Sequence, residues 1–214
     1  MIVSNSFAKS SPNNFFLFIV ITALILLKVT NINAQAQNYV VDGFWGLKFG
    51  QKKSECLGIL KAKGITPAIS EGDVYKFQNV KFAGKICNIA AIFFLKDQLV
   101  MGIFVYRPNK QIEIIDDYVN MSLLLMDKYG RPDSTLNKYE SPFDHPKTNS
   151  DRLIAITTGY AKHMQLWYST EKVTARNFVK LEIAVDPQLV ITYAYGPVFK
   201  LIEDNERKKA LDDL

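Results

Sequence analysis

The densest group of residues able to do chemistry is the short proline-containing stretch Ser141-Pro142-Phe143-Asp144-His145-Pro146. It offers the hydroxyl, imidazole and carboxylate that a serine hydrolase uses as nucleophile, base and orienting acid. Side chains this close in sequence rarely converge on a substrate, because those three groups need a rigid scaffold to orient them. We therefore expect a solvated loop, and a secreted hydrolase that uses the 141–151 loop stays as the alternative function.

The second histidine, His163, lies in a run that alternates along a strand. In that alternation it shares a face with Ala161, Gln165 and Trp167, which predicts a residue on the strand surface. The glycines between residues 43 and 50 match neither a phosphate-binding loop nor a dinucleotide motif. We expect no catalytic, cofactor-binding or metal-binding residues and no cofactor.

The N-terminal segment has the features of a secretory signal. The run Phe15 to Leu27 is apolar and is ended by Lys28. As a helix it would be about 20 Å long, shorter than the roughly 30 Å hydrocarbon core of a membrane. Ala34 and Ala36 form a cleavage motif of small residues. We predict that residues 1–36 are a signal peptide and that the mature protein is periplasmic or extracellular, with no stable membrane span. A retained membrane anchor is the alternative.

Composition excludes several classes of protein. About half of the 214 residues are apolar (48%) and 22% are charged, which is enough apolar material to form a core and rules out a disordered chain. Removing residues 1–36 takes away Lys9 and Lys28, which leaves 24 of the 26 basic residues against 21 acidic ones, or about +3. The mature part has no basic run interleaved with aromatics, so nucleic acid is not an expected partner.

Export also affects the two cysteines, because an oxidising compartment allows them to pair. Cys56 lies on the apolar stripe of an expected helix, and Cys87 lies on the apolar face of an expected strand. A helix packed on that strand would bring the two together as a disulfide. Two buried thiols that act as small apolar residues are the other interpretation, and the sequence leaves both open. A metal site has no support, because both histidines lie far from the cysteines in sequence.

The spacing of apolar residues predicts the elements of the first half. An amphipathic helix is expected from residue 52 to Gly64, whose glycine is suited to end it. Strands are expected at 74–77, 80–82, 86–95 and 99–106, the last two joined as a hairpin by residues 96–98. Trp45 and Gly50 are expected to be structural residues at the entry to the helix.

The spacing of apolar residues in the second half predicts the same order of elements. A helix is expected over 111–129, followed by a polar loop over 133–150 and strands at 153–157, 160–168, 178–185 and 189–195. The fold class is therefore α+β, with helix packed on antiparallel β-sheet. Two tandem helix-plus-meander repeats, 37–110 and 111–196, would account for this order, followed by a charged C-terminal helix over 197–214. Two unrelated segments within one α+β domain are the alternative.

One sequence feature resembles a known group of folds. The opening Phe44-Trp45-Gly46-Leu47-Lys48-Phe49-Gly50 leads within a few residues into the helix at Cys56, and Phe82-Ala83-Gly84 follows later. This entry is similar to that of secreted bacterial α+β proteins such as the β-lactamase inhibitor protein and the small lipoprotein of the outer-membrane barrel-assembly machinery. The resemblance covers residues 44–106, with a weaker echo over 111–196. It implies a helix-on-sheet fold and a non-catalytic binding or scaffolding role.

These observations favour an exported, non-enzymatic module that binds a protein or ligand partner in the cell envelope. The lipoproteins carry an anchoring cysteine at the cleavage site, and this chain has none there. Aromatic residues are frequent in the expected strands and are candidates for binding anchors. We expect most of them to pack in the core, namely Tyr75, Phe77, Tyr106, Trp167, Tyr168 and Tyr193.

Overall fold

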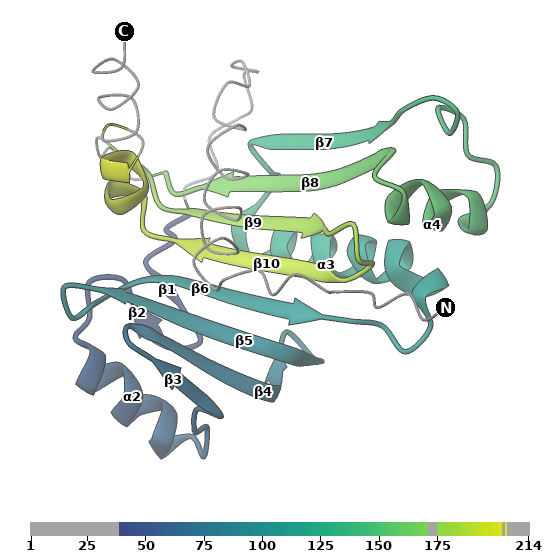
Figure 1. Ribbon diagram of the computed structural model, residues 1–214. Coiled ribbons are helices and arrows are strands. Elements are labelled where there is room, and N and C mark those ends of the chain that lie inside the picture. Colours follow the sequence, from purple (N-terminus) through teal and green to yellow (C-terminus); the bar gives the residue numbers. More distant parts are fainter. Residues whose placement is uncertain (1–38, 171–174, 203, 205–214) are drawn as a thin grey trace, which may run out of the picture. The chain divides into compact units, whose positions relative to one another are not determined.

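The apolar strands assemble into one large antiparallel sheet. The structure is a computed structural model that describes residues 39–170, 175–202 and 204. It is a mixed α+β fold built on an eight-stranded sheet (Figure 1). The predicted signal peptide, 1–36, and most of the predicted C-terminal helix lie outside the described residues. Within the described part, no helix has both the length and the apolar character needed to cross a membrane.

The first half follows the sequence prediction closely. Lys96 and Asp97 both have positive φ angles, 49° and 65°, as the tight turn of a two-residue hairpin requires. The strands predicted at 74–77 and 80–82 form one strand, distorted at Asn79, whose φ is +52°. The elements are β1 (Gly43–Phe44), β2 (Leu47–Lys48), α2 (Lys53–Ala62), β3 (Ile69–Glu71), β4 (Val74–Phe82), β5 (Lys85–Leu95) and β6 (Gln98–Tyr106).

The second half departs from the prediction at two places. The strand predicted at 153–157 is wrong, because these residues belong to a helix whose first turn is closed by a capping box between Thr148 and Asp151. The loop predicted over 133–150 contains an additional strand. The elements are η1 (Gln111–Glu113), α3 (Ile114–Tyr129), β7 (Ser134–Tyr139), α4 (Asn149–Thr157), β8 (Ala161–Tyr168), β9 (Phe178–Ile183) and β10 (Leu189–Ala194), with helix again over 196–202.

The order of strands across the sheet is β3-β4-β5-β6-β10-β9-β8-β7. Each half of the chain therefore contributes four neighbouring strands. The two sets join through their last strands, β6 and β10, which pair antiparallel from Leu189 opposite Tyr106 to Ala194 opposite Met101. One helix precedes each set, α2 before β3 and α3 before β7.

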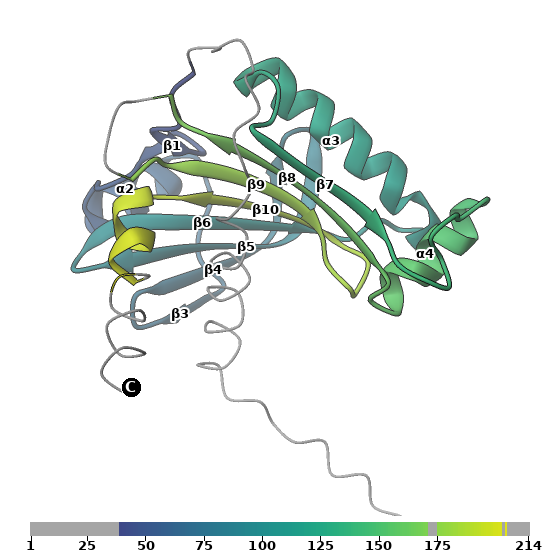
Figure 2. The same cartoon turned by 90° about the horizontal axis from the view of Figure 1, so that it is seen from above.

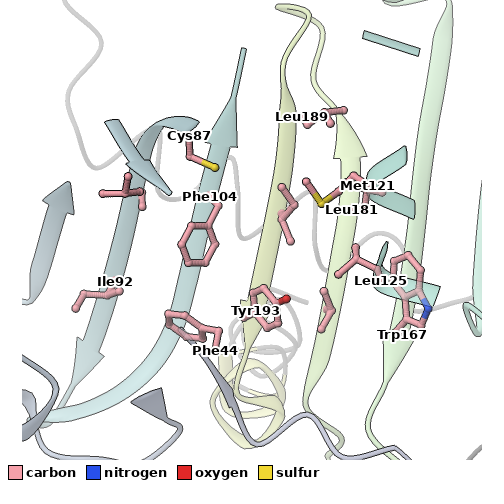
Figure 3. Close-up of a cluster of buried hydrophobic side chains, with 14 of the residues drawn as sticks. Phe44, Cys87, Ile92, Phe104, Met121, Leu125, Trp167, Leu181, Leu189 and Tyr193 are labelled. Carbon is pink, nitrogen blue, oxygen red and sulfur yellow. The ribbon is translucent and has the colours of Figure 1, made fainter. Parts of the chain in front are cut away.

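The main core lies between the sheet and its helices, on what we call the helix face. Figure 3 shows Phe44, Phe104 and Tyr193 grouped over the middle strands. In the same view Met121 and Leu125 of α3 approach Leu181 and Trp167. The indole N–H of Trp167 donates to the carbonyl of Gly130 at 2.9 Å, which fixes the end of α3 on β8. Buried side chains from both halves thus form one continuous core.

The opposite side of the sheet is here called the outer face. Figure 2 shows α3 on one side of the strands and the helical residues 196–202 on the other. The ring of Phe199 contacts the ring of Phe178 in β9, with centroids 5.3 Å apart. Over β6 and β8, outer-face side chains such as Ile103 and Leu166 are buried. Over β5, the outer-face side chains of Ile86, Ile89 and Leu95 are exposed.

Candidate functional site

The 141–151 loop does not assemble a catalytic group. The Nε2 atom of His145 lies 4.0 Å from the Asp144 carboxylate, and the imidazole side chain is 93% exposed. No hydrogen bond joins Ser141 to His145 in the described part of the chain. Residues 149–151 form the first turn of α4, and Asp151 is engaged in its capping box. The residues before that turn are mostly solvent-exposed, as the sequence predicts for a solvated loop.

His163 is buried, so its prediction as a strand-surface residue is wrong. Its face of β8 is the helix face, and α3 covers it. The ring lies 5.8 Å from the ring of Tyr118 in α3 and 5.1 Å from that of Tyr139 in β7. Its Nδ1 atom lies 3.1 Å from the side-chain oxygen of Asn137. Burial lowers the pKa of the imidazole, and the positive charge of Arg152 lowers it further.

A second polar group joins the two halves of the sheet near one end of α3. The ammonium of Lys85, at the start of β5, donates to the buried carboxylate of Asp117 in α3 at 2.6 Å. It also lies 5.1 Å above the ring of Tyr106. The bond to Asp117 raises the pKa of Lys85, because the charged form is the one that it stabilises. This group holds α3 against the start of β5 in the first half.

Both cysteines are buried free thiols, so the disulfide that the sequence left open is not formed in the structure. The thiol of Cys56 contacts the carbonyl of Gln51, which in turn accepts a hydrogen bond from Leu99. Leu99 pairs with Phe94, and Cys87 lies seven residues from Phe94 along β5. Seven extended residues span about 23 Å, far beyond the reach of a disulfide.

The two thiols also have low reactivity. Burial is the largest influence on both, and it raises the pKa of Cys56 to about 11 and that of Cys87 to about 12. The thiolate is the reactive form of cysteine, so neither residue is suited to be a nucleophile at neutral pH. In the part of the chain that the structure describes, no cluster of three or more His, Cys, Asp or Glu side chains is arranged to hold a metal ion.

The outer face carries an exposed row of apolar side chains along β5. Ile86, Ile89 and Leu95 are 55%, 47% and 41% exposed, and Phe93 lies between them, half-buried. We call these four residues the β5 patch. Large apolar side chains that gather on one strand face, rather than occurring singly, are typical of an interaction surface.

Polar side chains of the neighbouring strand border the β5 patch. In β4, Lys76 pairs with Ala91 and Gln78 with Ile89 on the outer face. Alternation breaks at Asn79, so beyond it the pair Lys81 and Ile86 also lies outside, opposite the buried Val80 and Cys87. Lys76 forms an ion pair with Glu71 at 3.0 Å, and Lys81 is exposed. An apolar centre with a polar, partly basic rim has the anatomy of a protein–protein interface.

The sequence of β5 contains a signal for this exposed apolar surface. Strand β5 reads Lys-Ile-Cys-Asn-Ile-Ala-Ala-Ile-Phe-Phe-Leu, which is apolar on both faces instead of alternating. Of the strand aromatics that the sequence offers as candidate binding anchors, Phe77, Trp167 and Tyr193 are core residues. The exposed apolar side chains of β5 are aliphatic, namely Ile86, Ile89 and Leu95.

Comparisons with family models, with curated proteins and with solved structures found no match to this chain. The residues themselves therefore carry the functional argument.

Proposed function

We propose that this protein is an exported, non-enzymatic binding module of the cell envelope that holds a partner protein on the β5 patch. The observation that carries the proposal is the exposure of Ile86, Ile89 and Leu95 along the outer face of one strand. Leaving such a surface in water is unfavourable, at roughly 25 cal/mol for each Å² of apolar area that a partner would cover. The lysines of β4 favour a partner whose own rim is acidic.

The fold supports this role through its construction. The proposal includes a duplication, with residues 37–110 and 111–196 as two tandem repeats. Each stretch contains a helix and then four antiparallel strands, and the fourth strands, β6 and β10, pair with one another. The second copy differs by the insertion of α4 between β7 and β8. The continuous sheet, with α3 packed on its helix face, holds the β5 patch on a rigid part of its outer face.

Nothing in the described residues favours the alternative of a hydrolase on the 141–151 loop. A catalytic imidazole needs a neighbour that fixes its orientation and a nucleophile within hydrogen-bonding distance. His145 is exposed and has only the 4.0 Å contact with Asp144.

The proposal can be tested with the mature chain, residues 37–214, immobilised and exposed to the envelope fraction of the host. The test variant is Ile89→Asp with Leu95→Asp, which places two charges in the β5 patch. The matched control is Leu123→Asp, an equally exposed leucine on α3, on the helix side of the sheet. Circular dichroism checks that every variant is folded. We expect one protein to be captured by the parent and by the control but not by the test variant.

Other results of this capture would overturn the proposal. Equal capture by all three proteins would exclude the β5 patch, and loss with Leu123→Asp alone would move the surface to α3. Retention of a small molecule, with no protein, would change the class of partner. Export is tested separately by mass spectrometry of protein from the host, which should begin at Gln35 or Gln37. An intact Met1 in the membrane fraction would contradict it.

A further inference from the structure

Three polar atoms with no hydrogen-bond partner among the described residues lie in the core between α3 and β8. They are the hydroxyl of Tyr118, Nε2 of His163 and the side-chain oxygen of Gln165. The three side chains are 5%, 8% and 9% exposed, so each is more than nine-tenths buried. A buried polar atom without a partner is unfavourable, because the hydrogen bond that it makes to water in the unfolded chain is lost and not replaced.

The three side chains lie on the facing surfaces of two elements, α3 and β8. His163 and Gln165 project from the same face of β8, two residues or about 7 Å apart. Tyr118 reaches them from α3, with its ring 5.8 Å from the imidazole. Side chains of this length can direct their polar ends toward one common point between the helix and the strand.

The protonation of His163 follows from its other nitrogen. Nδ1 faces the side-chain oxygen of Asn137 at 3.1 Å, and an amide oxygen can only accept a hydrogen bond. Nδ1 of the neutral ring therefore carries the proton, and Nε2 is an acceptor. The oxygen of Gln165 is also an acceptor, whereas the hydroxyl of Tyr118 can donate.

We infer that one buried water molecule is bound at this point, donating to Nε2 of His163 and to the side-chain oxygen of Gln165 and accepting from the hydroxyl of Tyr118. Two acceptors and one donor are the complement of water, which has two hydrogens to donate and lone pairs to accept. Buried waters in proteins make about three hydrogen bonds of this kind. A larger ligand would have to displace the rings of Tyr118 and Tyr139, both of which contact the imidazole.

This site links three elements of the second half. The water joins α3 to β8, and the bond between His163 and Asn137 extends the network to β7. A network in which every member is satisfied fixes the packing of the helix on the sheet more specifically than apolar contacts alone. The inference is independent of the proposed function, because none of these residues belongs to the β5 patch.

The first experiment uses the unaltered full-length mature protein. A crystal structure at high resolution should show one water oxygen about 3 Å from all three atoms. Two-bond proton–nitrogen NMR spectra should show the His163 ring protonated at Nδ1. Direct bonding of the Tyr118 hydroxyl to Nε2, a proton on Nε2, or the absence of the water would each overturn the inference.

The second experiment removes the acceptors. The variant His163→Phe with Gln165→Met keeps the volume but deletes both atoms that hold the water hydrogens. The long-lived water should disappear from water–protein NMR contacts with the ring of Tyr118. The control Thr157→Val removes an exposed hydroxyl from α4 and should leave the water in place. Persistence of the water in the double variant would contradict the inference, and if that variant does not fold the first experiment still decides.

Discussion

The ring of Phe44 lies directly over Gly102 in β6, at a point where a side-chain carbon on residue 102 would overlap the ring. The same ring contacts Tyr193 at a centroid distance of 5.4 Å and Phe104 at 5.9 Å. The glycine in the middle of this strand therefore makes room for the aromatic residue that the β1–β2 hairpin inserts into the core. This contact attaches the entry segment to the join between β6 and β10.

Gly102→Ala should destabilise the protein by about 1–3 kcal/mol, because the new methyl group overpacks the core against Phe44. Combining it with Phe44→Leu should cost less than the sum of the two single changes, since the smaller side chain vacates the space. Gly58→Ala is the control: this glycine lies in α2 with open space around it and should gain about 0.5–1 kcal/mol. Urea unfolding measures all four variants, and additive costs would contradict the contact.

Replacing Lys85 and replacing Asp117 should have unequal costs in stability, although the two residues form one ion pair. Lys85→Met leaves a carboxylate that is only 9% exposed without its partner, which should cost about 3 kcal/mol. Asp117→Asn should cost less, because the Lys85 side chain is 34% exposed and its ammonium can reach water. Lys138→Met, in the exposed pair with Glu140, is the control and should leave the urea midpoint unchanged. Equal costs for both partners would argue against a buried Asp117.

Stability should decrease as the pH falls below about 7, because the pKa of His163 is lowered in the folded state from an unfolded value of about 6.5. Between the two pKa values the unfolded chain binds the proton more tightly, so the free energy of unfolding falls by up to about 1.4 kcal/mol per pH unit. Below the folded-state pKa this contribution levels off. The groups that face the ring are Tyr118 from α3, Tyr139 from β7 and Arg152 from α4.

Urea midpoints measured from pH 8 to pH 5 test this dependence. His163→Gln should flatten the curve over the interval just below pH 7. His145→Gln should leave it unchanged, because that histidine is on the exposed loop. An unaltered curve for His163→Gln would show that the burial of the imidazole does not control the pH dependence.

The sequence predicts the elements that periodicity and turn chemistry specify locally. The β5–β6 hairpin and α3 are confirmed, because long apolar runs end at short polar turns or at Gly130. The strand predicted at 153–157 is wrong, because Leu153, Ile154 and Ile156 suit a strand as well as a helix. The capping box of Thr148 and Asp151, five and two residues before Leu153, is the decisive signal for a helix.

The burial of His163 and the exposure of the β5 patch were harder to predict from the sequence, because both depend on which face of each strand the helices cover. His163 alternates correctly with Trp167, and the alternation could not show that α3 packs on that face. In the same way, the exposure of Ile89 depends on which face of the sheet the helices cover. Strand β7 was missed because only one of its side chains, Leu136, is aliphatic, and its pairing with β8 is a long-range contact.

Thiol titration should find two free cysteines in the unfolded protein without reductant, since Cys56 in α2 and Cys87 in β5 are free thiols that lie far apart. The native protein should react slowly at neutral pH, because both thiols are buried and their pKa values are raised to about 11 and about 12. Absence of thiols in the unfolded, non-reduced sample would mean that the disulfide forms and that the helix face packs differently.

Trp45 occupies the turn between β1 and β2, where its φ angle of 59° is unusual for a residue with a side chain. Its ring contacts Phe77 and Phe104 edge-on, at centroid distances of 5.6 Å and 5.3 Å. The ammonium of Lys63, at the end of α2, donates to the Trp45 carbonyl at 2.7 Å. The residue therefore ties the entry hairpin both to the sheet and to the first helix, as the sequence indicated.

Trp45→Ala should cost about 3 kcal/mol, at the lower end of the range for buried aromatic residues because the ring is half-buried. Trp45→Phe should recover part of this loss by keeping an aromatic ring against Phe104. Ser141→Ala and His145→Ala lie on the exposed loop and should change stability by no more than about 0.5 kcal/mol. Urea midpoints compare the two sets. A Trp45→Ala protein as stable as the parent that no longer captures the partner would make Trp45 a recognition residue and remove its structural role.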